Sequence, residues 1–322
     1  MTRFLIRLIS RVSFGCIGIV LLALAVGRIL PPEDEILFSA STTIFNIQIF
    51  RMSIARQIIV PMTSSEEVNA SPVWSPDGQS IAFISKYQNG QNIYLMNPTG
   101  GGINQLTDSY GGLPIWSPDG QKIAFTRFTG EKNDVMLKVL QSDETHQLTH
   151  NTQPNFSPTW LPDSQHLTFI SIDIHPHDET SNVNNLDIEN GQTHLIFTTQ
   201  HYITNLAWSP DARYLAYLAY APVSALYLWD TIRNQSFLLY IYPFIDPEMN
   251  YTDVPEWSAD GRSIFFATIY TPTPDTYRLG IFQLVVASCL QQAQNCSPKL
   301  LGSLPTAYYV PHFDMHLRPH QP

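Results

Sequence analysis

Short apolar strands separated by turns rich in proline and glycine recur along most of this chain. Each recurrence starts with a Trp, passes through a polar turn and enters a strand with an aromatic residue nine positions after the Trp. The five turns read Trp74-Ser-Pro-Asp-Gly78, Trp116-Ser-Pro-Asp-Gly120, Trp160-Leu-Pro-Asp-Ser164, Trp208-Ser-Pro-Asp-Ala212 and Trp257-Ser-Ala-Asp-Gly261. The aromatic residues are Phe83, Phe125, Phe169, Tyr217 and Phe266. A period of 42 to 49 residues predicts stacked supersecondary units rather than one irregular fold.

Each unit predicts four strands. A Pro-x-Trp strand leads into a type I turn, in which Pro fixes φ at the second position and Gly is tolerated at the last. In the first complete copy the second, third and fourth strands follow at Ile81–Ser85, Asn92–Met96 and Gln105–Thr107. Four strands in about 45 residues are typical of one blade of a β-propeller.

The two ends of the chain predict a sixth blade. Near the N-terminus, Ile36–Ala40, Asn46–Phe50 and Gln57–Val60 match the second to fourth strands but have no Trp turn before them. Near the C-terminus, Pro311-His-Phe313 matches Pro-x-Trp and has no further strands after it. We therefore predict an all-β, six-bladed propeller closed by a C-terminal strand, with Phe313 in the sixth Trp position. Ring closure would hide the edges that an open sheet exposes.

This pattern resembles the TolB-like propeller repeat, the WSPDG-type or PD40 repeat, a WD40-like family. The resemblance covers about residues 33–318 and leaves residues 319–322 as a tail. TolB itself carries an additional α/β domain before its propeller, whereas about 30 residues precede the repeats here. The resemblance therefore implies a stand-alone propeller, and a role in the cell envelope is an expectation from the family.

Residues 1–32 read as an export signal. Arg3, Arg7 and Arg11 precede the uncharged stretch 12–27, an arrangement that keeps the N-terminus in the cytoplasm and sends the rest across the membrane. We favour a signal anchor, a transmembrane helix from about Val12 to Leu30, which would tether an extracytoplasmic propeller to the cell membrane. A cleaved signal peptide ending at Ala25 is the alternative.

The charge balance disfavours nucleic acid as a partner. The net charge is −10, and residues 31–322 hold 13 basic against 27 acidic residues. An acidic domain repels phosphate groups and favours a neutral or cationic partner.

The repeated Asp and Trp residues read as structural. Asp in such a turn bonds nearby backbone N–H groups. Trp on an inner strand is expected to wedge into the core and to need one partner for its indole N–H. The predicted structural residues are Trp74, Asp77, Trp116, Asp119, Trp160, Asp163, Trp208, Asp211, Trp257, Asp260 and Phe313.

No catalytic constellation stands out. The chain has no G-x-S-x-G motif and no room for a hydrolase domain, so no catalytic residue is predicted. Asp173, His175 and His177 lie close together in a predicted loop and could hold a transition metal. Solvated loop residues are the better interpretation, since nothing fixes a tetrahedral arrangement. No metal and no cofactor are therefore predicted.

Tyrosines gather in the loops that are predicted on the face opposite the Ser-Pro-Asp-Gly turns. Tyrosine gives a large contact area at a low entropic cost, so this clustering suggests a recognition surface. Packing between blades explains the tyrosines equally well. The candidate binding residues are Tyr110, Tyr202, Tyr220, Tyr242, Tyr251, Tyr270, Tyr277, Tyr308, Asp173, His175 and His177.

Cys289 and Cys296 flank a predicted polar loop, Leu290–Asn295. Outside the cytoplasm they are expected to form a disulfide that staples the loop, and two free thiols are the alternative.

Two hypotheses of function follow. The first is a non-catalytic, membrane-anchored module that binds a protein or peptide in the cell envelope. The alternative is a carbohydrate-binding or glycan-acting propeller, in which tyrosines of the central funnel stack on a saccharide. A purely structural envelope protein is a further possibility that the sequence does not separate from the first.

Overall fold

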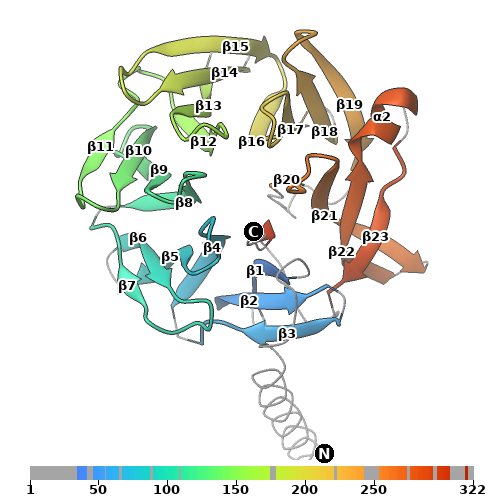
Figure 1. The fold of residues 1–322 in the computed structure, drawn as a ribbon, viewed down its shortest axis with the longest axis horizontal. Coiled ribbons are helices and arrows are strands. Elements are labelled where there is room, and N and C mark those ends of the chain that lie inside the picture. The colour runs from blue at the N-terminus through green and yellow to red at the C-terminus, as the bar shows by residue number, and fades with distance from the viewer. Residues whose placement is uncertain are drawn as a thin grey trace, which may run out of the picture.

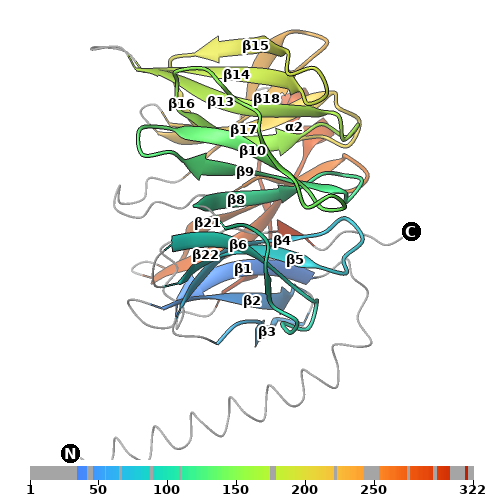
Figure 2. The same ribbon diagram turned by 90° about the vertical axis from the view of Figure 1, so that its left-hand side faces the viewer.

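Six four-stranded antiparallel sheets surround a central axis (Figure 1), and Figure 2 shows the same ring from the side. The computed structural model describes residues 35–41, 46–54, 56–64, 67–87, 90–108, 110–174, 179–220, 223–242, 254–273, 276–292, 296–304 and 316–317. Within these residues the predicted six-bladed, all-β propeller is confirmed.

Five blades are continuous in sequence, with the first strand innermost and the fourth at the rim (Figure 1). The second blade holds β4 (Val68–Trp74), β5 (Ile81–Tyr87), β6 (Gly90–Met96) and β7 (Asn104–Gln105), and the third holds β8 (Gly111–Trp116), β9 (Lys122–Phe128), β10 (Asn133–Val139) and β11 (Thr145–Gln147). The fourth holds β12 (Asn155–Trp160), β13 (His166–Ile174), β14 (Glu179–Asp187) and β15 (Thr193–Thr199). The fifth holds β16 (Tyr202–Trp208), β17 (Tyr214–Tyr220), β18 (Ser224–Asp230) and β19 (Gln235–Ile241). The sixth holds β20 (Glu256–Trp257), β21 (Ser263–Thr273), β22 (Thr276–Val285) and β23 (Lys299–Ser303), with a short helix α2 (Val286–Gln292) before β23.

The first blade is built from both ends of the chain. Its order is β24 (His316–Leu317), β1 (Glu35–Ser41), β2 (Ile47–Ser53) and β3 (Ile58–Pro61), so a C-terminal strand closes the ring as predicted.

The register of this closing strand corrects one detail. In the second blade Trp74 pairs with Ile81, and the equivalent residue of the first blade, Ile36, pairs with Leu317. Leu317, four residues after Phe313, therefore holds the sixth Trp position. The assignment of Phe313 was wrong because the C-terminal segment has no Ser-Pro-Asp-Gly turn to fix the count. Phe313 itself lies outside the described residues.

The aromatic residue nine positions after each Trp forms the core of its blade. These side chains, and Phe38 in the first blade, are at most 3% exposed and pack on the neighbouring blade. The equivalent residues are Phe38, Phe83, Phe125, Phe169, Tyr217 and Phe266. The nine-residue spacing in the sequence therefore separates the Trp at the end of the inner strand from the aromatic residue at the core of the blade.

The Asp of each repeated turn holds the turn together. In the second blade the Asp77 carboxylate accepts hydrogen bonds from the Ser75 hydroxyl and from the backbone N–H of Gln79, at 3.0 Å for the latter. These two hydrogen bonds lower the pKa of Asp77 below its usual value of 3.8. Hydrogen bonds lower the pKa values of Asp211 and Asp260 in the same way, first of all those from the serine two residues earlier. The structural interpretation of these residues fits this geometry.

We expect the stabilisation that these turns contribute to the fold to be lost in acid. Because the folded-state pKa of Asp77 lies below the unfolded value, the unfolded chain binds its proton first, and the stabilisation present above about pH 4 is lost as the pH falls through the lower value. The free energy of unfolding should fall less between about pH 5 and pH 2 in Asp77→Asn than in the wild type. The difference should be at most about 1 kcal/mol because the turn is exposed. Denaturant titrations at several pH values measure this, and Asp108→Asn, at an exposed carboxylate outside the turns, should leave the dependence unchanged. Equal slopes for wild type and Asp77→Asn would contradict the expectation.

Two hairpins are longer than the sequence predicted. Strands β13 and β14 pair as far as Ile174 and Glu179, and β21 and β22 as far as Thr273 and Thr276. Asp173, Tyr270 and Tyr277, which were predicted in loops, therefore lie in strands. The prediction was wrong because the facing start of β14 is polar and the end of β21 is Thr-rich, although Ile170, Ile172 and Ile174 of β13 do alternate with polar residues.

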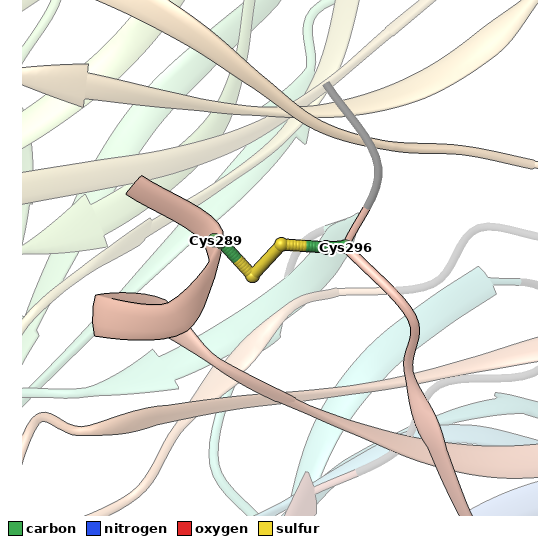
Figure 3. Close-up of a disulfide and its surroundings, with 2 residues drawn as sticks. All are labelled: Cys289 and Cys296. Atoms are coloured by element: carbon green, nitrogen blue, oxygen red, sulfur yellow. A yellow bond between two sulfur atoms is a disulfide. The ribbon is translucent and has the colours of Figure 1, made fainter. Parts of the chain in front are cut away.

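Cys289 and Cys296 are joined by a disulfide, with their Cα atoms 5.1 Å apart (Figure 3). The segment after Cys289 corrects the predicted polar loop, because α2 continues through Leu290 to Gln292. None of the helices within the described residues is long and apolar enough to cross a membrane. The predicted anchor in residues 1–32 lies outside those residues.

Candidate functional site: the axial cavity

A cavity of about 490 Å³ lies between the inner strands of five blades. Residues of β4, β8, β12, β16 and β20 line it, together with prolines of the adjoining turns, so it lies on the side of the repeated Trp turns. All five repeat tryptophans contribute, as do six prolines. The lining tryptophans are Trp74, Trp116, Trp160, Trp208 and Trp257, and the lining prolines are Pro76, Pro114, Pro118, Pro158, Pro210 and Pro255.

β-Bulges shape the wall of this cavity. In β4, β8 and β12 the register of the ladder shifts just before the Trp. In each of these strands the residue before the proline has a left-handed backbone, with φ of 49° at Ser71, 48° at Leu113 and 45° at Ser157. A residue before proline normally has an extended backbone, so this conformation carries a local energetic cost. Pro lacks an N–H and is tolerated where a bulge interrupts the ladder. All three left-handed residues line the cavity.

Leu113 is the clearest of these positions. Its side chain is 40% exposed although it is apolar, β-strand residues rarely have positive φ, and it lines the cavity. Strained, exposed apolar residues in a concave site are candidates for ligand contact.

The indole N–H groups fix the tryptophans between blades. The N–H of Trp257 donates to the carbonyl of Ala207 at 3.0 Å, and that of Trp160 donates to the carbonyl of Ile115 at 3.4 Å. Each acceptor belongs to the inner strand of the preceding blade. The rings of Trp160 and Trp257 are thus held by their polar edge, whereas the buried N–H of Trp116 has no partner within the described residues. All five indoles line the axial cavity.

The wall of the cavity is mainly apolar. Its polar groups come from the serines at the bulges, Thr159, Asn205 and Glu256, and among the described lining residues Glu256 is the one carboxylate. Such a wall favours an apolar or proline-containing ligand with few polar contacts.

The tyrosines predicted as a recognition surface separate into different environments. Tyr110 and Tyr202 are exposed, and Tyr220 is half-buried at the end of β17. Tyr242 is buried and packs edge-on against Phe266, with ring centroids 5.6 Å apart. Tyr242 therefore belongs to the core of the sixth blade, which corrects its assignment to a contact surface.

The remaining candidates are placed only in part. Tyr270 is half-buried in β21, edge-on to Phe282 at 5.7 Å between ring centroids, and Asp173 in β13 accepts a hydrogen bond from the Asn182 side chain at 2.8 Å. The backbone of Tyr277 is described in β22 but its side chain is not. Four candidates lie outside the described residues: Tyr251, Tyr308, His175 and His177. In the part of the chain that is described, no group of three or more His, Cys, Asp or Glu residues could hold a metal ion.

The sequence analysis placed a ligand in a central funnel lined by tyrosines and missed the tryptophans and prolines that line the axial cavity. The x-Pro-x-Trp motif was read as a strand entry with a core Trp. In the structure the same four residues form the bulge, the interruption of the ladder and the wall of the cavity. A proline inside an inner strand is the signal that could have predicted the bulge.

Comparison with known proteins supports the same fold. Residues 112–225 match the family model described as the TolB beta propeller domain, PD40. An uncharacterised protein of Agrobacterium fabrum is 27% identical over 160 residues, which are 47% of this chain and 54% of that protein. The match thus spans about half the length of this relative.

Two solved structures illustrate the range of proteins with this architecture. TolB from Acinetobacter baumannii superposes with a TM-score of 0.70 and 16% identity, covering 89% of this chain and 67% of that one. An oligogalacturonate lyase from Vibrio parahaemolyticus superposes with a TM-score of 0.51 and 13% identity, covering 83% and 84%. At these identities the likeness is one of fold.

Proposed function

We propose that this chain, of which residues 112–225 match the TolB beta propeller domain, is a non-catalytic module that binds a protein or peptide partner in the cell envelope. The observation that carries the proposal is the axial cavity, which is walled by tryptophans and prolines of five blades. Residues 1–32 would anchor the propeller in the cell membrane, with the blades on the extracytoplasmic side.

The shape of the cavity favours an extended segment over a folded domain. A volume of about 490 Å³ between five inner strands suits several residues of one chain. Aromatic-lined grooves bind proline-rich segments because the preformed polyproline II helix loses little conformational entropy on docking. The acidic balance of the chain adds a preference for a neutral or basic partner.

The chemistry of the wall favours binding over catalysis. The same fold occurs in TolB and in an oligogalacturonate lyase, so the choice depends on the residues of the site. Hydrolysis of a glycosidic bond usually needs a pair of carboxylates, and the described lining contributes Glu256 alone, so the wall disfavours a glycosidase.

Leu113→Asp tests the proposal directly. Asp tolerates a left-handed backbone, so the variant should fold, while its charge should disfavour an apolar segment in the cavity. We expect at least a tenfold loss of partner in quantitative cross-linking of the full-length protein in membranes. Ile232→Asp, at an exposed apolar residue that does not line the cavity, should recover the partner as wild type does. Equal recovery by both variants would refute the axial site.

The same experiment locates the tyrosine surface. Tyr110→Ala and Tyr202→Ala remove the two candidates that are exposed among the described residues, and they leave the axial wall intact. A loss of partner with these variants, but not with Leu113→Asp, would move the binding site to the surface around Tyr110 and Tyr202.

Carbohydrate binding is the second candidate, and the five indole rings at one cavity favour it. Aromatic faces can stack on sugar rings, and such binding would need no further carboxylate. Calorimetric titration with neutral and acidic oligosaccharides separates the candidates, since heats that Leu113→Asp abolishes would support a saccharide ligand in the axial cavity.

A further inference from the structure

A second cavity, of about 260 Å³, lies between the first and second blades and shares no lining residue with the axial cavity. It is walled on one side by the segment that follows β3 and on the other by β5, β6 and the loop after β6. Its volume is below that of most drug-sized sites, so it suits one compact group.

Glu67 supplies a carboxylate to this cavity. Two side-chain amides hold its backbone carbonyl, because Gln48 donates to that oxygen at 2.7 Å and Asn69 donates to it at 3.2 Å. The carboxylate itself accepts one hydrogen bond from the buried Ser85 hydroxyl, at 3.3 Å. Among the described residues Glu67 has no salt-bridge partner, although its side chain is half-buried. The cavity therefore holds a positioned carboxylate with no cationic side chain paired to it in the part of the chain that the structure describes.

A second buried acceptor lies on the same face of the blade, although Asn92 is not among the residues that line the cavity. Asn92 pairs directly with Ser85 across β5 and β6, so the two side chains emerge on the same face. The side-chain carbonyl oxygen of Asn92 is buried and has no hydrogen-bond partner within the described part of the chain. An ammonium group has three N–H donors and no acceptor, which matches the two lining acceptors that lie together, the Glu67 carboxylate and the Ser85 hydroxyl oxygen.

Part of the wall is apolar. Phe83 and Tyr94 pair across the same two strands with ring centroids 5.9 Å apart, and Met62 and the exposed Ile103 add to this part. Thr63, Ser64 and Asn69 contribute polar lining. Gly100 keeps the two sides close, since a Cβ there would lie 2.5 Å from the Met62 carbonyl oxygen. An alkyl chain of a few carbons could pack on this wall while its charged end reaches Glu67. Aromatic rings near a cation add a further attraction.

We propose that this inter-blade cavity binds a primary alkylammonium group, with the ammonium at Glu67 and the alkyl chain against Phe83, Tyr94 and Ile103. The group comes either from a free alkylamine or from a lysine side chain of a partner. The site is independent of the axial cavity and of the function proposed for it.

Titration of the purified full-length chain with n-butylamine tests this site, with ethylamine and n-butanol as probes of the apolar and charged contributions. We expect each methylene added between ethylamine and butylamine to tighten binding about fourfold. Butanol should bind at least tenfold more weakly than butylamine. Glu67→Gln should weaken butylamine binding at least tenfold. Glu131→Gln, at an exposed carboxylate outside the cavity, should not change it.

A second variant separates loss of the site from loss of the fold. Ile103→Ala removes an exposed side chain, so it should preserve the melting temperature and weaken butylamine more than ethylamine. Equal binding of butanol and butylamine, or unchanged binding by Glu67→Gln, would overturn the proposal. Nα-acetyl-lysine methylamide distinguishes the two sources: its binding indicates a partner's lysine, whereas binding of butylamine alone indicates a free amine.

Discussion

Replacing Phe125 by Ala should lower the free energy of unfolding by about 3–5 kcal/mol. The ring is fully buried and packs with Ala82 and Ile93 of the second blade and with Met136 of its own. Its loss leaves a cavity at the contact between two blades, which the neighbouring β-sheets cannot close by a small shift because their ladders fix the strand positions. Equilibrium unfolding in guanidinium chloride, followed by Trp fluorescence, measures the change.

Phe128→Ala is the matched control for this prediction. Phe128 ends the same strand, β9, but its side chain is 51% exposed. The same chemical change should therefore alter the free energy of unfolding by no more than about 0.5 kcal/mol. If the two variants lost equal stability, the contact between blades would not be the source of the stabilisation.

The architecture could be predicted because each repeat has the same spacing between its Trp and its core aromatic residue. The distance from Trp74 to Phe83 recurs in every complete copy, and in the structure it joins the end of an inner strand to the blade's core. Because both residues are large and apolar, their spacing is visible in one sequence without any alignment. The N-terminal unit lacks its first strand, and the C-terminal segment contains one such strand without the other three. Together they predicted a sixth blade that closes the ring.

The elements that lack this fixed spacing were predicted less well. The strand that holds Leu317 has neither a Trp nor a polar turn, so the count was anchored on Phe313 instead. The hairpin of β13 and β14 was ended too early, although Ile170, Ile172 and Ile174 alternate with polar residues to the end of β13. The facing segment of β14, residues 179–182, is wholly polar, so the apolar pattern of one strand has no counterpart in the other.

The candidate site was the hardest feature to predict, because it depends on backbone conformation. A Trp inside a blade and a Trp at the wall of an axial cavity have the same sequence neighbours. What separates them is the bulge at Leu113 and its counterparts, where a left-handed residue before proline redirects the strand. Tyr242 shows the converse, because a residue assigned to a loop surface packs against Phe266 in the core.

Deleting residues 316–322 should destabilise the propeller by at least about 3 kcal/mol and cause self-association. The deletion removes β24, so β1 loses its ladder along Ile36 and Leu37 and becomes an open edge. These two side chains and that of Phe38 are fully buried in the closed ring, and part of that burial depends on the inner strand. Guanidinium unfolding measures the loss of stability, and light scattering after gel filtration measures the association.

Deleting residues 319–322 instead leaves the β1–β24 pairing intact and should behave as wild type in both measurements. Amide hydrogen exchange adds a local readout, since the amides of β1 should lose protection in the longer deletion while those of β17, in the fifth blade, keep theirs until global unfolding. Full protection of β1 after the longer deletion would mean that β1 and β2 hold the edge without β24. A loss confined to β1 would show that one two-residue ladder secures the join between the two ends of the chain. The ring would then open at the first blade, the one blade whose strands are not continuous in sequence.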